Sequence, residues 1–331
     1  MKTVQIAEPN RVEVFDLPRP EPRETEVLLR VMASGICGTD IHILRGQYLA
    51  EYPVIPGHEF SGVVEQVGRQ VTRFKPGDRV AVEPNVACDN CESCLNNRQN
   101  FCENWQGIGV TRSGGMAQYA AAPQKAVFDI GDLPFEQAAF MEPLSCVIHG
   151  IEKTGLRLGS RVAILGAGPI GILLLKAIRL LGGCEVAVAE KNEARRSFAE
   201  RRGADTAVAD LDGLRKDYYD VVIDATGAPS AMKRTFEFAR RGGTVLLFGV
   251  APGGARMEIE PFEIFRKGLS IHASFTSVRN SLQAVSLLRS GRMDVDELIS
   301  HRLPLQDFER GVEIIERGAE NVMKAMVFPN G

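Results

Sequence analysis

Metal-ligating side chains lie close together in two segments near the start of the chain, residues 35–42 and 57–62. Cys37 and His58 offer a thiolate and an imidazole, the ligand pair that divalent zinc prefers, and Glu59 adds a carboxylate beside them. Flanking glycines let the backbone turn tightly enough for these side chains to converge. Alone, such residues are more often a buried free cysteine or a surface histidine, but the group, with the motifs below, predicts a catalytic metal site.

Three further side chains with proton-transfer chemistry follow Cys37 closely. Thr39, Asp40 and His42 supply a hydroxyl, a carboxylate and an imidazole. Groups of these types can pass a proton to solvent, or can support metal ligands through hydrogen bonds. We therefore expect all three to belong to the same site.

The run G-H-E-x2-G-x5-G-x2-V at 57–71 resembles the signature of the zinc-dependent medium-chain alcohol dehydrogenases, and the resemblance extends over nearly all 331 residues. It implies a GroES-like barrel as the catalytic domain. It also implies that Thr39 hydrogen-bonds the alcohol oxygen, with a relay through the cofactor ribose to His42. Asp40 is then expected to orient His58 as a carboxylate behind the metal ligand.

The third ligand of the catalytic metal stays open between two carboxylates. Glu142 stands where related alcohol dehydrogenases of higher organisms have a cysteine, and it precedes Pro143. This Glu-Pro pair is similar to that of polyol (sorbitol), threonine and butanediol dehydrogenases. In those enzymes carboxylates matching Glu59 and Glu142 share the site, one binding the metal directly and the other directly or through water. Glu142 could alternatively be an ordinary carboxylate at a helix start.

A second group of thiols has the spacing C-x2-C-x2-C-x7-C and consists of Cys88, Cys91, Cys94 and Cys102. Four thiolates form a closed tetrahedral set with no position left for water, which is how structural zinc is held. A cluster of reduced surface thiols would oxidise readily. A nucleic-acid-binding zinc knuckle would need more interleaved aromatic and basic residues. The pattern therefore predicts a structural zinc in a lobe spanning 84–105.

A dinucleotide-binding fingerprint begins after the apolar run 161–165. Gly166, Gly168 and Gly171 form G-x-G-x-x-G between an expected strand and an expected helix, and Glu190 follows a second strand. The glycines allow a tight turn, an approach of the backbone to the pyrophosphate and close helix packing, and the helix start faces the phosphates. A glycine-rich turn without a ligand is the alternative.

The choice of cofactor depends on Glu190, whose carboxylate can bind the ribose 2′-hydroxyl and repel a 2′-phosphate, so the sequence favours NAD over NADP. Lys191 and Arg195 could accommodate a phosphate, but an arginine matching Arg195 accompanies NAD in sorbitol dehydrogenase-like chains. The resemblance implies further cofactor contacts at Pro169, Ile170, Phe248, Gly249, Val250, Ser274 and Phe275.

Composition limits the class of protein. With 44% hydrophobic and 24% charged residues the chain is typical of globular proteins, and its net charge of −3 gives no indication of a nucleic-acid surface. No run is apolar and long enough to span a membrane, and the first residues lack the apolar core of a signal peptide. Seven cysteines then point to metal or thiol chemistry in a cytoplasmic protein.

The order of patterns predicts an α/β protein with two domains. Short strands and Gly/Pro turns fill the first part, and strand-helix alternation begins near residue 152. We expect a discontinuous GroES-like catalytic zinc domain at 1–151 and 285–331. A doubly wound parallel-sheet (Rossmann) NAD-binding domain at 152–284 is expected between them.

A zinc site and a dinucleotide domain in one chain predict hydride transfer. Zinc acts as a Lewis acid on an alcohol and NAD accepts the hydride, so the expected enzyme converts a secondary alcohol, diol or sugar alcohol to the ketone. Ile43 and Thr276-Ser277 depart from the sorbitol dehydrogenase pattern, so the substrate stays open. A threonine or butanediol dehydrogenase, a zinc-free quinone or enoyl reductase and a non-catalytic NAD sensor are the rivals. The resemblance implies a homo-oligomer, a dimer or homotetramer.

Overall fold

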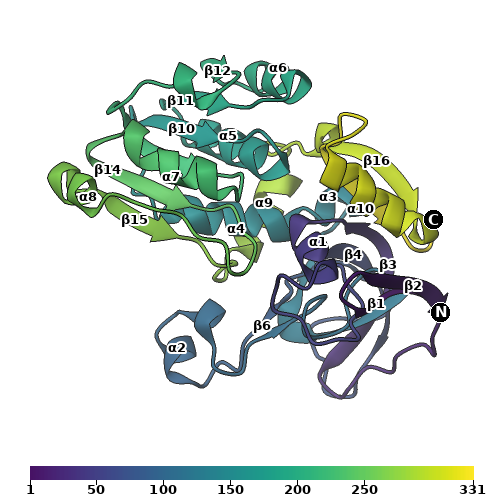
Figure 1. Cartoon of the computed structure of the whole chain (residues 1–331). Helices are drawn as coiled ribbons and strands as arrows, with labels where there is room; N and C mark the ends of the chain where they lie inside the picture. The colour runs from purple at the N-terminus through teal and green to yellow at the C-terminus, as the bar shows by residue number, and fades with distance from the viewer. The chain divides into compact units, whose positions relative to one another are not determined.

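The computed structural model describes all 331 residues, which form two compact units: Met1–Ser145 with Val278–Gly331, and Cys146–Ser277. Figure 1 shows the chain in colours that follow the residue number. Helix α4 runs through the boundary near residue 145. Each unit is described by itself.

The first unit is made mostly of short strands. Its strands are β1 (Lys2–Glu8), β2 (Arg11–Asp16), β3 (Glu26–Gly35), β4 (Glu59–Val67), β5 (Arg79–Val82), β6 (Asn85–Val86), β7 (Gln106–Gly107), β8 (Tyr119–Pro123), β9 (Val127–Asp129), β16 (Ile299–Pro304) and β17 (Lys324–Phe328). Its helices are α1 (Gly38–Leu44), α2 (Glu92–Leu95), α3 (Phe135–Ala138), α4 (Met141–Glu152), α9 (Ser281–Arg289) and α10 (Phe308–Arg317). The 3-10 turns are η1 (Gln99–Phe101), η2 (Gln124–Ala126), η4 (Asp296–Leu298) and η5 (Leu305–Asp307).

Strand β3 is the centre of this unit. Seven strands form one sheet in the order β16-β17-β3-β4-β5-β9, with β8 also paired to β3. Valine and leucine side chains of β3 are buried on both faces, because the strand has neighbours on both edges and a core on either side. The strand ends at Gly35, opposite Glu59 at the start of β4, so the two expected ligand segments are brought together by strand pairing.

The segment around α2 forms a lobe that protrudes from the strands of this unit (Figure 1). The short hairpin of β6 and β7 closes its base. Asp89 and Asn97 within it have left-handed backbone angles, φ +63° and +56°, a conformation that Asp and Asn tolerate better than most residues. The lobe is therefore a series of tight turns with little core of its own.

The second unit is a parallel sheet with helical connections. Its elements are β10 (Arg161–Leu165), α5 (Pro169–Leu181), β11 (Glu185–Ala189), α6 (Glu193–Arg201), β12 (Thr206–Val208), η3 (Leu211–Gly213), β13 (Tyr219–Asp224), α7 (Pro229–Phe238), β14 (Ala239–Leu247), α8 (Pro261–Lys267) and β15 (Ser270–Ala273). All neighbouring strands are parallel, in the order β12-β11-β10-β13-β14-β15. The order reverses beside β10, so ligands are expected at the carboxyl ends of the strands there.

One strand of this sheet is irregular. Strand β14 begins at Ala239, and a bulge after the pair Tyr219–Ala239 takes up residues 240–243 with their two glycines before regular pairing starts at Thr244. The edge strand β15 ends at Ala273, so Ser274 and Phe275 lie just beyond its carboxyl end.

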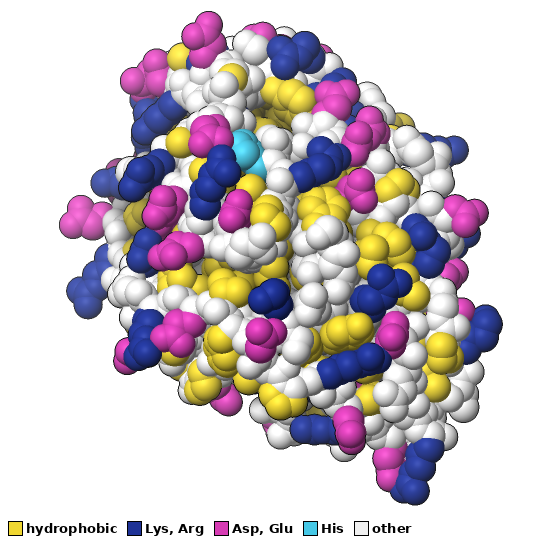
Figure 2. Space-filling view, turned by 90° about the vertical axis from the view of Figure 1, so that its right-hand side faces the viewer, with side chains coloured by type: hydrophobic (Ala, Val, Ile, Leu, Met, Phe, Trp, Pro, Cys, Tyr) yellow, Lys and Arg dark blue, Asp and Glu magenta, His cyan; other side chains and the backbone are white.

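Charge is distributed without large patches on the face drawn in Figure 2, where Lys/Arg and Asp/Glu side chains alternate. No helix is long and apolar enough to cross a lipid bilayer.

Candidate active site

Three candidate ligands converge in the first unit. The sulfur of Cys37, an imidazole nitrogen of His58 and a carboxylate oxygen of Glu59 all lie within 4.8 Å of one another. Cys37 precedes α1 as its N-cap, while Glu59 begins β4, and His58 and Glu59 are buried. One sulfur, one nitrogen and one oxygen are a donor set that suits zinc, and three protein ligands are the number that catalytic zinc sites use.

Asp40 connects the two ligand segments through hydrogen bonds to the backbone of each. Its carboxylate is fully buried and accepts hydrogen bonds from the backbone N–H of Cys37, at 2.8 Å, and of Gly57, at 3.1 Å. Nδ1 of His58 lies 3.4 Å from Asp40 Oδ1 and has no closer hydrogen-bond partner. Burial alone would lower the pKa of His58, but the Asp40 carboxylate and the Cys37 thiolate outweigh burial and hold it well above its ordinary value. Asp40 therefore fixes the backbone of both segments and the imidazole together.

Glu59 is paired with the ammonium of Lys324, which comes from strand β17. Both side chains are almost fully buried. Gly35 leaves the space for this pair, because a Cβ there would meet Glu59 Oε2 at 2.5 Å and Lys324 Cε at 2.8 Å. Burial would lower the pKa of Lys324, yet the carboxylate of Glu59 raises it above the ordinary value. Sequence patterns gave no indication of Lys324, because its strand joins the sheet only through long-range pairing.

The other expected residues of this site lie nearby in the chain but are held differently. Thr39 and His42 are on α1, three residues apart and so on the same side of the helix, and His42 Nδ1 lies 3.2 Å from Gln47 Oε1. Glu142 is buried in the first turn of α4 and is not part of the three-ligand cluster. Its role as a ligand stays a prediction.

The four thiols of the lobe also converge, with their sulfurs within 4.8 Å of one another. Cys91 Sγ lies 3.5 Å from Cys94 Sγ, and Cys102 Sγ accepts hydrogen bonds from the backbone N–H of Cys88, at 3.2 Å, and Asn104, at 3.3 Å. Backbone N–H groups, chiefly that of Asn90, lower the pKa of Cys88 to about 6. A set of four sulfurs surrounded by N–H donors fits a closed structural zinc site.

The glycine-rich turn of the second unit matches the chemistry expected for it. Gly166 has φ +99°, and a Cβ on Gly171 would lie 2.0 Å from the carbonyl oxygen of Gly166, so neither position accepts a side chain. A Cβ on Gly168 would meet nothing within 4 Å, which leaves open space at the start of α5. Pro169 and Ile170 form the first turn of that helix. The turn fits a pyrophosphate at the helix N-terminus.

Glu190 lines a cavity of about 460 Å³ beside this turn. Its carboxylate accepts hydrogen bonds from the backbone N–H of Ala167 and of Asn192, both at 2.8 Å. The cavity is formed by the residues that follow β10, β11, β12 and β13, and Lys191 also lines it. Arg195 is in the first turn of α6, whose N-cap is Asn192. This cavity is where the adenosine half of a dinucleotide is expected.

Asp224, the last residue of β13, holds the loop that follows this strand, and no sequence motif identified it. Its buried carboxylate accepts hydrogen bonds from the hydroxyl of Thr226, at 2.6 Å, and the N–H of Gly227, at 3.1 Å, and burial raises its pKa. A Cβ on Gly249 would lie 2.1 Å from Gly227 N, so the expected contacts Phe248, Gly249 and Val250 are packed against this loop. Ser274 Oγ, farther along, is buried without a hydrogen-bond partner.

Comparison with known proteins gives a consistent result. The family model for the alcohol dehydrogenase GroES-like domain matches residues 23–132, and the model for zinc-binding dehydrogenases matches 169–290. The D-altritol 5-dehydrogenase of Agrobacterium fabrum is 38% identical over 93% of this chain and 94% of its own length.

Two solved structures cover 99% of this chain and 99% of their own. One is a candidate zinc-binding dehydrogenase from Sinorhizobium meliloti 1021 bound to NADP, with a TM-score of 0.93 and 35% identity. The other, described as a short chain alcohol dehydrogenase from Escherichia coli CFT073 in complex with NADH, has a TM-score of 0.92 and 28% identity.

The chain belongs to the zinc-dependent medium-chain alcohol dehydrogenase family, with a GroES-like part and a Rossmann-type parallel sheet. It is an oxidoreductase that uses zinc and NAD to transfer a hydride to or from a secondary alcohol, diol or sugar alcohol. The sequence-based predictions of family, fold class, activity and cofactors are thus confirmed.

Proposed function

We propose that Cys37 and His58 hold the catalytic zinc together with a carboxylate, and that the substrate is a sugar alcohol. The observation that carries the first part is the convergence of the Cys37, His58 and Glu59 ligand atoms within 4.8 Å. When bound, zinc supplies Lewis-acid polarisation of the alcohol oxygen, and NAD supplies the hydride acceptor. Glu59, which lies in this cluster, and Glu142, which is buried in the first turn of α4, are the candidate carboxylates, one binding the metal directly and the other directly or through water.

The remaining catalytic roles fall to residues around the cluster. Asp40 holds His58 and the backbone of Cys37, which keeps the ligands oriented. Thr39 would accept a hydrogen bond from the alcohol hydroxyl and, as the alcohol loses its proton, would release its own hydroxyl proton to the cofactor ribose, from which His42 would pass a proton to solvent. Placement three residues apart on α1 supports this pairing.

A second zinc is proposed to be structural and to be held by Cys88, Cys91, Cys94 and Cys102. The four sulfurs offer only thiolate ligands, so the site would be closed to substrate. Its role would be to order the lobe at 84–105, which otherwise consists of turns.

Sugar alcohol is proposed as the substrate class because the Agrobacterium relative is named for the polyol D-altritol. The test is zinc stoichiometry together with NADH formation on a panel of sugar alcohols, diols, simple secondary alcohols and L-threonine. We expect about two zinc ions per chain and the highest kcat/KM on a polyol. A kcat/KM on L-threonine or a simple diol far above that on every polyol would contradict the substrate proposal while leaving the enzyme class intact.

We also propose that the enzyme prefers NAD to NADP. Glu190 would repel a 2′-phosphate and lose a charge-assisted bond to the ribose, about 2 kcal/mol in total or roughly 30-fold. Glu190→Ser should relax the preference, because Lys191 lines the same cavity and could then bind the phosphate. The measurement is kcat/KM for both cofactors in wild type and variant. A wild-type preference for NADP, the cofactor bound in the Sinorhizobium structure, would contradict the proposal.

We assign the cofactor contacts and the catalytic residues to different domains. Residues 152–284 are proposed as the NAD-binding domain, and 1–151 with 285–331 as the catalytic domain. The contacts proposed on the second unit are Gly166, Gly168, Pro169, Ile170, Gly171, Glu190, Arg195, Phe248, Gly249, Val250, Ser274 and Phe275. Open space at Gly168 and the unpartnered Ser274 hydroxyl support them.

Finally, we propose a homo-oligomer, a dimer or homotetramer, in the cytoplasm. Strand β15 is the edge of its sheet, and Ile271 on it and Phe262 and Phe265 on α8 are exposed. Exposed apolar groups beside an open strand edge support pairing with a second copy. Seven free cysteines fit a reducing compartment. Sedimentation of wild type and Phe265→Glu tests the assembly, since a monomeric wild type would contradict it.

A further inference from the structure

One wall of the adenosine cavity is a short loop with little structure of its own. Asp210 and Leu211 line the cavity after β12 and lead into the single turn η3. The carboxylate of Asp210 accepts hydrogen bonds from the N–H of Asp212, at 2.9 Å, and Gly213, at 3.2 Å, which shapes the turn. These bonds are local, so they do not fix the loop relative to the opposite wall.

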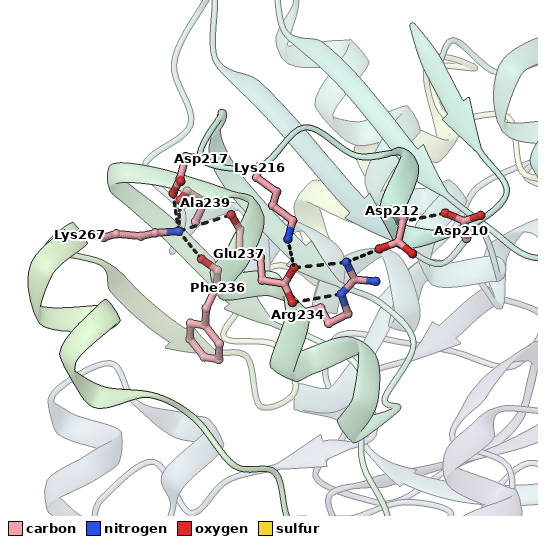
Figure 3. A network of polar contacts seen from close by, with 9 residues as sticks. All are labelled: Asp210, Asp212, Lys216, Asp217, Arg234, Phe236, Glu237, Ala239 and Lys267. Carbon is pink, nitrogen blue, oxygen red and sulfur yellow. Dashed lines mark hydrogen bonds and ion pairs between the residues drawn. The ribbon is translucent and has the colours of Figure 1, made fainter.

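Arg234 connects this loop to helix α7, the opposite wall. Its Nη2 donates to Asp212 Oδ1 at 2.7 Å, and Nε and Nη2 donate to the two oxygens of Glu237 at 3.1 and 3.2 Å. Figure 3 shows the guanidinium between the two carboxylates. The side chain is 26% exposed and itself lines the cavity. A single cation thus joins two walls that come from different parts of the chain.

Helix α7 is the fixed partner in this arrangement. The buried ammonium of Lys267 donates to the carbonyl oxygens of Phe236, at 2.7 Å, and Ala239, at 3.2 Å, and pairs with Asp217 at 2.5 Å, so the end of the helix is capped (Figure 3). Glu237 is further held by Lys216 at 3.3 Å. By contrast, Asp212 is 82% exposed. Arg234 therefore joins a helix that is held by several contacts to a loop whose Asp212 side chain is otherwise open to solvent.

We propose that Arg234 is a positioning residue that holds the loop 210–213 as a preformed wall for the adenine half of the cofactor. An arginine fork already fixed by Glu237 loses little further freedom when it binds Asp212. The ordering of the loop then precedes cofactor binding and does not reduce the affinity. The inference rests on this cavity being the adenosine site. Its consequence is that Arg234 sets the affinity for the adenosine half and leaves the hydride-transfer step unchanged.

The test compares Arg234→Met with Asp212→Asn, which removes the other end of the tether at an exposed position. Lys233→Met is the matched control, since Lys233 is an exposed cation on the same helix that does not line this cavity. Dissociation constants are measured for NADH by fluorescence and for 5′-AMP by competition, and unfolding temperatures are recorded in parallel.

We expect Arg234→Met to weaken NADH and 5′-AMP by the same factor, about fivefold, and Asp212→Asn by about threefold, the scale of one partly exposed ion pair. The double variant should equal Arg234→Met, because both changes break one tether. The kcat at saturating NAD should stay within about twofold of wild type. Lys233→Met should bind both ligands as wild type does.

Three results would overturn the inference. The first is that Arg234→Met binds NADH and 5′-AMP as tightly as Lys233→Met does. The second is that Arg234→Met binds NADH more weakly than wild type but binds 5′-AMP equally well. The third is that the losses of affinity in Arg234→Met and Asp212→Asn add up in the double variant. If Arg234→Met does not fold, unchanged binding in Asp212→Asn overturns it by itself. A wild-type protein that binds NADH but not 5′-AMP would contradict the placement of the adenosine half, and with it the inference, while the dehydrogenase activity would stand.

Discussion

The two groups of candidate zinc ligands rest on different kinds of backbone. Cys37 lies between the end of β3 and the start of α1, and His58 and Glu59 lie at the start of β4, where a seven-stranded sheet fixes the chain. Cys88 to Cys102 lie within 15 residues on turns, one short helix and a 3-10 turn. The first cluster is held by the sheet, whereas we expect the lobe to take its order from the metal proposed for it.

The two groups also differ in the charged side chains that surround them. The first cluster has a buried carboxylate, Asp40, and a buried ammonium, Lys324, as fixed partners. The lobe has mainly backbone N–H groups directed at its sulfurs, and one ion pair on its surface, Lys125 with Asp89. A preformed, charge-balanced site can keep its geometry while a ligand position exchanges, and a closed set of thiolates has no such position. We therefore expect changes in the first group to affect mainly catalysis and changes in the four thiols to affect mainly stability.

The largest expected effect is on activity. Cys37→Ser should reduce kcat about a thousandfold or more, because serine is a poor zinc ligand and the polarising metal would be lost. The unfolding temperature should change little, since the sheet and not the metal holds this segment. Steady-state rates, metal content and thermal unfolding check this. Activity within tenfold of wild type would contradict the catalytic-zinc assignment.

Next in size is the loss of the structural metal. Cys94→Ser should lower the zinc content from about two ions per chain toward one and should reduce the stability by at least a few kcal/mol. Rates per folded molecule should fall much less than in Cys37→Ser. Elemental analysis and thermal unfolding provide the test. A variant that keeps both metals and its stability would remove the distinction between the two sites.

A smaller effect is expected behind the catalytic ligands. Asp40→Asn keeps the shape of the side chain but removes the negative charge beside His58, and should weaken zinc binding or activity by about 10- to 100-fold. Competition with a chelator measures the affinity of the more easily removed zinc. The lobe zinc is the internal control, because Asp40 has no contact with it. Equal loss of both ions would point to general unfolding instead.

The smallest effect is on the surface of the lobe. Asp89→Asn removes the ion pair with Lys125, in which both side chains are about half exposed, and should cost less than about 1 kcal/mol. Zinc content should remain that of wild type. A loss as large as that of Cys94→Ser would mean that surface charge and not metal holds the lobe.

The sequence singled out the residues whose side chains converge in both clusters, although their role as zinc ligands stays a prediction. The thiols recur within one lobe, and G-H-E stands at the start of β4, where strand pairing sets Glu59 opposite Gly35. Strand β10 also covers the apolar run 161–165 that the sequence indicated. Spacing could not predict the partners. Lys324 reaches Glu59 through the pairing of β17 with β3, and Arg234 reaches Asp212 across a cavity.

The ion pair between Glu59 and Lys324 can form only late in the synthesis of the chain, because its two residues lie far apart in the sequence. The segment that carries Cys37, His58 and Glu59 leaves the ribosome first, and β17 follows only after the whole unit Cys146–Ser277. Until β17 is made, the carboxylate of Glu59 lacks the ammonium of Lys324, so the cluster of Cys37, His58 and Glu59 carries one positive charge fewer and attracts a metal cation more strongly. Metal could therefore enter the nascent chain more easily than the finished one. Synthesis in zinc-rich and zinc-poor medium would then differ in a way that later addition of zinc does not repair.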